Sequence, residues 1–471
     1  MNARTAAIAV IATLALGVVT YFALQPRSPA PMPPGAASRL STVNTATLVR
    51  VADGDESVTL TAAPELDTWL IQAGPAEPSW PAETGAVQGA LRLLSELSRV
   101  PAHPSRPPAS TECASVTLAL PNQPDLSLLF TRQSLGGTTK AHELTADTTA
   151  SLELDAPSQT AELFRPRNVL AWRRPDLLAA PGTPTDIRIE SSSATLAFKQ
   201  VDGKWTLMLP VPAPVEPAAM KELLSATLPA TRFTPSTEST PPSALNSPVA
   251  TITRTTRIVN TRGDAELITT EVTIGTAADT AQETFHASAV ARRTLVAVKQ
   301  PSGTPSTAWG PVNAVLDGAS ITAIARTPEY YVSKRAVQVP AADIAGLRVL
   351  PPTHAFQLTT PLGDDGDSAA TYVRTLDGWT RDGTPLDGAS ASATAALLFL
   401  LSESPAARVH LTGIDHPITP HCALAVRNAA GGLVEVVGIG EDETSIYIRS
   451  GRVIREYTKS GSADALTLLR P

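Results

Sequence analysis

A tryptophan motif recurs three times along the chain, and this repeat constrains the fold more than any other feature of the sequence. In each copy a Trp in an expected strand precedes a loop rich in Pro or Gly, then an apolar helix, then an Arg; the three residues are Trp69, Trp205 and Trp379. The arginine follows its Trp by 30, 27 and 29 positions, at Arg99, Arg232 and Arg408. Because nearly constant spacing is typical of tandem structural repeats, the sequence predicts three copies of one module.

The segments around each Trp indicate the order of elements. Residues 202–214 (DGKWTLMLPVPAP) and 377–389 (DGWTRDGTPLDGA) each begin with an Asp-Gly pair that is typical of a tight hairpin turn. Apolar residues of the helices fall on one face, as Met220, Leu223 and Leu224 do. Strands with alternating apolar positions follow at 111–120, 246–255 and 420–429. We therefore predict an α+β fold of three tandem modules, each with antiparallel strands packed on one helix in the order β-β-α-β-β-β.

The predicted domain boundaries follow from the repeat and from local composition. Residues 25–38 (QPRSPAPMPPGAAS) contain five prolines and are expected to form an extended spacer, because such a segment cannot form a strand ladder. The expected parts are a membrane anchor or signal peptide at 1–26, a Pro-rich spacer at 27–44, a divergent module 1 at 45–165, module 2 with a bridge at 166–330, and module 3 at 331–471.

The N-terminal segment predicts a transmembrane helix. Residues Thr5 to Pro26 form an uncharged run of 22 residues, which as a helix spans about 33 Å and can cross a hydrocarbon core of about 30 Å. A cleaved signal peptide is the alternative, although its apolar region is normally about 7–15 residues. Arg4 and the terminal amine favour a cytoplasmic N-terminus. We expect a single-pass protein of the bacterial inner membrane with most of the chain extracytoplasmic, in the periplasm.

The overall charge argues against one large class of partners. The net charge is −7, and Lys and Arg do not cluster along the sequence. A nucleic-acid-binding protein normally presents a basic stripe that follows the phosphates, so nucleic acid is not an expected partner. The 42 prolines also make long uninterrupted helices improbable.

The repeat suggests structural roles for its most distinctive residues. The Trp residues are expected to pack in the cores rather than to form ligand platforms, and each Arg is expected to complement the negative end of the preceding helix. Cys113, Val249 and Cys422 stand 44, 44 and 43 residues after their Trp. A position that accepts either Val or Cys is typical of a small buried apolar site, so we predict two unpaired, buried thiols.

A few segments resemble chemical sites, but none has the required spacing. His410, His416 and His421, together with Cys422, are separated by six and five positions, which fits neither a helical pair nor a tight knuckle of metal ligands. The acidic GDDGDS (363–368) lacks the spaced ligands of a calcium loop. GIGEDE (438–443) lacks the third Gly and the helix of a dinucleotide fingerprint, so both are expected to be turns. The sequence predicts no catalytic, cofactor-binding or metal-binding residue, and no cofactor.

Residues 186–226 (DIRIESSSATLAFKQVDGKWTLMLPVPAPVEPAAMKELLSA) resemble the start of a bacterial membrane-anchored family known as domain of unknown function 4340. The Ile-Gly pairs at 274–275 and 439–440 and the bridge at 330–349 (YYVSKRAVQVPAADIAGLRV) also resemble it. The likeness covers roughly 165–460 and consists of packing residues. It implies an extracytoplasmic protein associated with ABC-type export and gliding-motility components, and it supplies no catalytic residues.

Two functions of different classes fit these features. The leading hypothesis is a non-enzymatic, membrane-anchored accessory or scaffold protein that binds partner proteins of a membrane complex, for example an ABC-type transporter. The alternative is a cell-envelope hydrolase or glycan-binding protein with a site between modules, for which the His- and Asp-containing segment 410–421 is the best support.

Overall fold

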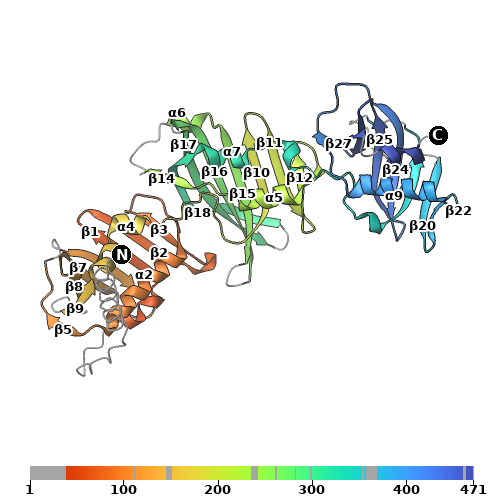
Figure 1. Cartoon of the computed structure of the whole chain (residues 1–471). Helices are drawn as coiled ribbons and strands as arrows, with labels where there is room; N and C mark the ends of the chain where they lie inside the picture. Colours follow the sequence, from red (N-terminus) through yellow and green to blue (C-terminus); the bar gives the residue numbers. More distant parts are fainter. Residues whose placement is uncertain are drawn as a thin grey trace, which may run out of the picture. The chain divides into compact units, whose positions relative to one another are not determined.

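The computed structural model describes most of the chain beyond the N-terminal segment (Figure 1). The described residues are 39–109, 113–144, 151–234, 242–259, 263–281, 283–297, 300–352, 355–356, 369–459 and 463–469. Within these ranges, no helix combines the length and the apolar character needed to cross a membrane. The predicted anchor at 1–26, the spacer through residue 38 and the acidic segment 363–368 lie outside the described residues.

The first compact unit ends at Arg174 and contains one nine-stranded antiparallel sheet. Its elements are η1 (Arg39–Thr45), β1 (Leu48–Asp53), β2 (Glu56–Ala63), η2 (Pro64–Leu66), β3 (Thr68–Ala73), β4 (Trp80–Ala82), α2 (Thr84–Glu96), η3 (Leu97–Arg99), β5 (Ala102–Ser105), β6 (Cys113–Ala119), β7 (Leu126–Leu135), β8 (Thr138–Leu144), β9 (Ser151–Pro157), α3 (Ser158–Leu163) and α4 (Pro166–Leu170). Helix α4 packs on β1, β2 and β3, so the unit extends past the module boundary at 165 that the sequence suggested.

The second compact unit begins at Pro175 and contains the other two sheets. Module 2 consists of β10 (Thr183–Ser191), β11 (Thr195–Val201), β12 (Lys204–Leu209), β13 (Ala213–Pro214), α5 (Pro217–Ser225), β14 (Ala230–Thr234), α6 (Pro242–Asn246), β15 (Ala250–Val259), β16 (Ala265–Asp279), β17 (Thr284–Ala297), β18 (Gln300–Asp317), α7 (Gly318–Ile324) and α8 (Pro328–Tyr331). Module 3 consists of η5 (Ala341–Asp343), β19 (Ile344–Leu350), β20 (Ala370–Thr375), β21 (Gly378–Arg381), β22 (Thr384–Pro385), α9 (Gly388–Ser402), β23 (Arg408–His410), β24 (Thr419–Asn428), β25 (Leu433–Glu441), β26 (Ser445–Ser450), β27 (Val453–Thr458) and η7 (Ala463–Leu469).

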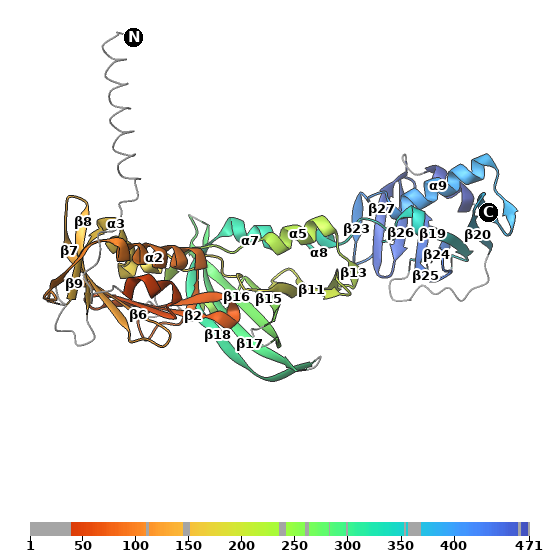
Figure 2. The ribbon, with the colours of Figure 1, turned by 90° about the horizontal axis from the view of Figure 1, so that it is seen from below.

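All three sheets have the same strand order, which confirms the α+β class and the three tandem modules. In the first sheet the order is β4-β3-β2-β1-β6-β7-β8-β9-β5, and the other two repeat it with β10–β18 and β19–β27. Four strands form a meander, the helix then carries the chain to the opposite edge, and a short edge strand precedes the last four strands. Figure 2 shows α5 and α7 on one side of the module 2 sheet.

The predicted order β-β-α-β-β-β is wrong in its number of strands, because each sheet has nine. Three of the unpredicted strands, β4, β13 and β22, have only two or three residues, too few to show an alternating pattern. Each of them contains a proline, which lacks a backbone donor and is tolerated at the edge of a sheet.

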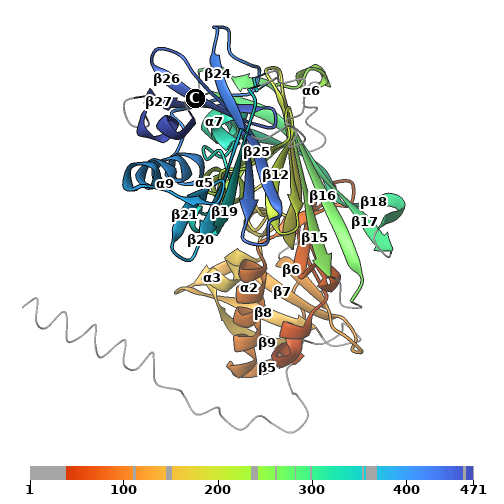
Figure 3. The ribbon, with the colours of Figure 1, turned by 90° about the vertical axis from the view of Figure 1, so that its right-hand side faces the viewer.

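Turns and caps explain why these elements begin where they do. Asp202 and Gly203 both have positive φ, 50° and 77°, as a two-residue hairpin turn requires. Asp387 caps α9 by accepting a hydrogen bond from the Ser390 amide at 2.7 Å. In module 3, Leu397 and Leu401 of α9 pack with residues of β19 and β20 in one core (Figure 3).

The three Trp residues occupy equivalent positions. Each lies in the third strand of its meander, at the second residue pair from the hairpin turn: Trp69 pairs with Ala62, Trp205 with Gln200 and Trp379 with Arg374. The motif that revealed the repeat therefore marks one position of the module.

The three arginines, in contrast, are not equivalent. Arg99 ends the short helix η3 directly after α2, where a cation can complement the helix end. Arg232 lies in β14 and pairs with Val315, and Arg408 lies in β23 and pairs with Glu456. The expected role therefore fits Arg99 alone.

The segment between α8 and η5, which bridges modules 2 and 3, is hydrogen bonded to both of them. The Ser333 amide donates to the Pro214 carbonyl at 2.9 Å, and the Ser333 carbonyl accepts from Arg455 Nε at 2.9 Å. The Val337 amide then donates to the Leu401 carbonyl at 2.9 Å. Arg455 is fully buried, so the bridge is part of the packing of module 3.

The two cysteines are buried and form no disulfide, as predicted, but they are not equivalent. Cys422 belongs to the core that faces α9. Cys113 adjoins Ala114, which pairs with Phe130, and Phe130 stacks on Phe164 next to the helix α3. Since successive strand residues face opposite sides, Cys113 faces away from the helices.

Val249, which the sequence aligned with the two cysteines, is 41% exposed, and its neighbour Ala250 occupies the buried position. The sequence alignment was one residue out of register.

Candidate functional site

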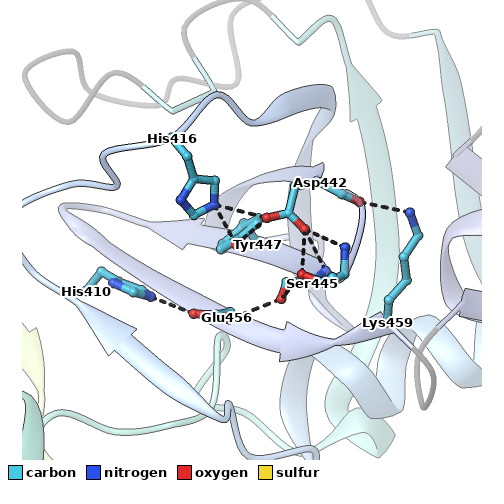
Figure 4. A network of polar contacts seen from close by, with 8 residues as sticks. His410, His416, Asp442, Ser445, Tyr447, Glu456 and Lys459 are labelled. Carbon is cyan, nitrogen blue, oxygen red and sulfur yellow. Dashed lines mark hydrogen bonds and ion pairs between the residues drawn. The ribbon is translucent and has the colours of Figure 1, made fainter.

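The three histidines named by the sequence lie in module 3, where they belong to a network of charged and polar side chains. Figure 4 shows two of them, His410 and His416, with their partners. His410 comes from β23, His416 from the loop after it and His421 from β24. Their partners come from the hairpin of β25, β26 and β27, which is much later in the chain. Each histidine contacts a different carboxylate, at Glu456, Asp442 and Glu441 respectively.

Asp442 is the centre of the network. It lies in the turn between β25 and β26, where its Oδ1 accepts hydrogen bonds from the amides of Thr444 at 2.8 Å and Ser445 at 2.7 Å. Its Oδ2 accepts from the Tyr447 hydroxyl at 2.7 Å and lies 3.0 Å from His416 Nε2. His416 Nε2 is also 2.9 Å from the Tyr447 oxygen. The Asp442 carboxylate thus contacts groups of its own turn, of strand β26 and of the loop that contains His416.

Asp442 is held in its ionised form and Tyr447 in its neutral form. The hydrogen bond from Tyr447, opposed by burial and helped by the backbone amides, holds the pKa of Asp442 well below its usual range. Burial, and then the hydrogen bond to Asp442, raise the pKa of Tyr447 to about 12. At neutral pH Asp442 is therefore an acceptor and Tyr447 a neutral donor, which suits a structural hydrogen bond better than proton transfer.

A second branch of the network joins Ser445, Glu456 and His410. Ser445 Oγ donates to Glu456 Oε1 at 3.1 Å, and His410 Nε2 lies 3.0 Å from Glu456 Oε2. The three residue types match a hydrolase triad, but the order differs. In a triad the histidine lies between the serine and the acid, where it removes the proton of the nucleophile. Here the acid lies in the middle, so His410 cannot activate Ser445 in this arrangement.

The third branch contains His421, Glu441 and Lys459. His421 Nε2 lies 3.0 Å from Glu441 Oε1, and Lys459 Nζ lies 2.9 Å from Glu441 Oε2. Burial tends to raise the pKa of Glu441, but the Lys459 hydrogen bond and the nearby His421 outweigh it, so the pKa is lowered. Lys459 Nζ also donates to the Asp442 carbonyl at 2.9 Å, which connects this branch to the centre.

The structure does not gather the histidines around a common point. Among the described residues, no group of three or more His, Cys, Asp and Glu could hold a metal ion. Burial raises the pKa of the Cys422 thiol to about 12, and this residue packs in the core on the other face of the sheet from the network. The segment 438–443 forms the end of β25 and the turn after it, which is the hairpin that the sequence predicted.

Sequence reasoning missed the partners of the histidines. The missed partners lie 20 to 38 residues after His421, the last residue of the histidine segment, and only strand pairing brings them together. They are Glu441, Asp442, Tyr447, Glu456 and Lys459. The one local signal is the Asp-x-Thr-Ser spacing at 442–445, which is typical of a turn capped by an Asp side chain.

A second site, a cavity of about 1010 Å³, lies in module 2. Residues of β12, β13 and α5 line it, including Trp205, Ala213, Met220 and Leu224. The sequence named Trp205 only as a packing residue. The side chain is partly exposed because it faces this space.

Comparisons with known proteins give no match: no family model, no curated protein and no solved structure resembles the chain at a significant level.

Proposed function

We propose that the chain is a non-enzymatic, extracytoplasmic accessory or scaffold protein. In this proposal residues 1–26 anchor it in the bacterial inner membrane, and its modules bind partner proteins of a membrane complex. An ABC-type transporter is the partner class that the family resemblance at 186–226 suggests.

One observation carries the proposal: the same nine-stranded sheet is built three times in one chain. Tandem copies of a packing unit multiply the surface available to partners, and repeat proteins are commonly binding proteins for this reason. A catalytic site, by contrast, needs one convergent set of groups with a defined order.

The polar network of module 3 supports the same conclusion. Its carboxylates are engaged by neighbouring side chains and amides, so the network joins β23, the loop containing His416 and the β25–β26 turn. Such a set of contacts stabilises the shape of a surface, whereas a general base needs an unengaged position facing a substrate.

The test is crosslinking of the full-length chain in intact membranes, followed by mapping of the crosslinked peptides. We expect membrane-complex subunits, a transporter among them, joined to defined positions in the modules. A matched variant in which His410, His416 and His421 are all Ala should retain these crosslinks if the histidines are structural. Crosslinks confined to lipids or to random abundant proteins would contradict the proposal.

The same triple variant tests the alternative, an envelope hydrolase or glycan-binding protein. The observation that favours this alternative is the exposed surface of His416, whose side chain is 51% accessible beside Tyr447 and Asp442. Loss of a measurable hydrolytic activity or of glycan binding in the variant, with unchanged thermal stability, would replace the scaffold proposal.

A further inference from the structure

We propose that the cavity of module 2 binds an amphipathic anion, namely an acyl chain with an anionic headgroup. The cavity lies between the strand pair β12–β13 and helix α5, and its volume of about 1010 Å³ is at the upper end of the about 300–1,000 Å³ typical of small-molecule sites. Two other cavities of this unit are less than half as large, at about 470 Å³ and about 460 Å³.

The interior of the cavity suits an apolar body. Trp205 contributes an indole face, and Met220 and Leu224 contribute flexible aliphatic groups from one side of α5. Met and Leu side chains can adapt to a chain of variable shape. Proline rings at 212, 214 and 217 complete the apolar lining. Each methylene of a ligand that is buried in such a site adds to the affinity.

The charge at the edge of the cavity selects the sign of the headgroup. Lys204 at the start of β12 and Lys221 on α5 both line the cavity and are both exposed. Of the described residues that line it, none is acidic. The chain as a whole has a net charge of −7, whereas the described lining of this cavity carries two cations and no acid. A carboxylate or a phosphate would complement it.

Module 1 shows that the module does not need this space in order to fold. In module 1 the residue paired with Ile71, two positions after Trp69, is Trp80. In module 2 the residue paired with Leu207, two positions after Trp205, is Ala213. Trp80 is fully buried and its Nε1 donates to the Arg174 carbonyl at 2.9 Å. An indole therefore occupies in module 1 the position that Ala213 leaves open in module 2.

The choice of an acyl chain rests on the proposed function, because a protein tethered to a membrane meets acyl anions at the bilayer surface. Free fatty acids and acyl phosphates share the relevant chemistry. The experiment separates them, and it does not depend on whether a protein partner is found.

The probe is a dodecanoate that carries a photoreactive diazirine and an alkyne tag, added to the full-length chain in lipid nanodiscs. We expect the label to map to peptides of β12 and α5. Excess dodecanoate or dodecyl phosphate should reduce this labelling by about tenfold, whereas dodecanol and dodecyltrimethylammonium should compete poorly. The stronger of the two anionic competitors identifies the headgroup class.

Three variants sharpen the test. Ala213→Trp, which copies the module 1 residue, should reduce the labelling by about tenfold or more because it fills the cavity. Lys204→Glu combined with Lys221→Glu changes only exposed side chains and should reduce it by a similar factor. Lys199→Glu changes an exposed lysine of β11 outside the cavity lining and should leave it unchanged.

Three results would overturn the proposal. They are equal labelling of the Ala213→Trp and wild-type chains, equal competition by the neutral or cationic amphiphile, and label spread over all three modules. Crosslinking to partner proteins would be unaffected by any of these results, so the proposed scaffold function and the ligand site can fail separately.

Discussion

Modules 1 and 2 share a strand order and a Trp position, yet they differ at one place in the sheet. Module 1 buries Trp80 there, whereas module 2 has Ala213 and a cavity. Module 3 has a third variant, the exposed Thr384, and its Trp379 packs against the core. The comparison teaches that the three modules share one strand order, while the side chain at a single position decides whether the space beside β3 or β12 is occupied by an indole or remains a cavity.

Replacement of the buried Trp80 should have the largest effect on stability. Trp80→Ala deletes a fully buried indole and its hydrogen bond to the Arg174 carbonyl. We expect a loss of about 3–5 kcal/mol in the free energy of unfolding of module 1. Hydrogen–deuterium exchange of the full chain under native conditions should show faster exchange in β3 and β4. Trp205→Ala, which borders an existing cavity, is the matched variant and should cost clearly less.

Substitution of Trp for Ala213 at the cavity of module 2 should change the stability little. Ala213→Trp should change the free energy of unfolding by less than about 1 kcal/mol, because the added indole enters existing space. Ala287→Trp is the control, since this fully buried alanine lies in β17 of the same sheet, and it should destabilise by about 1–3 kcal/mol or more through overpacking. Equal destabilisation by the two substitutions in thermal melts would show that the cavity is not accessible to an indole.

Module 3 carries the charged network around Asp442, which makes its stability depend on acid pH. The folded-state pKa of Asp442 is below its unfolded value, so the stabilisation is complete above about pH 4 and is lost as the pH falls through the folded pKa. Thermal melts between pH 7 and pH 2 should show this loss as a falling melting temperature, and hydrogen–deuterium exchange over the same range should become faster in the β25–β26 turn. Asp442→Asn should remove the dependence and lower the melting temperature at pH 7. An identical acid profile for the wild type and the variant would assign the effect to other carboxylates.

The thiols should give the smallest effect on stability. Cys113 and Cys422 are both buried and form no disulfide. Both should therefore react with an alkylating reagent after denaturation without a reductant, and neither should react quickly in the native chain. Mass spectrometry of intact protein counts the added groups. A protected pair in the denatured, non-reduced chain would reveal a disulfide and contradict the structure.

The register of the strands shows where sequence reasoning stopped. Spacing from the Trp aligned Cys113, Val249 and Cys422, but a shift of one residue moves a side chain to the other face of a sheet. The burial of Ala250 and the 41% exposure of Val249 correct that alignment. Spacing counts residues and cannot detect a bulge or a loop that is one residue longer.

The amino-acid sequence by itself determined the threefold repeat, the class of fold, the position of the Trp in each module and the hairpin at 438–443, because these depend on local periodicity and turn chemistry. Only the tertiary structure decided which side chains meet. His416 and Asp442 are 26 residues apart, and Ala213 borders a cavity because the chain places β13 opposite α5. Such contacts arise from strand pairing between distant segments, which no local pattern records.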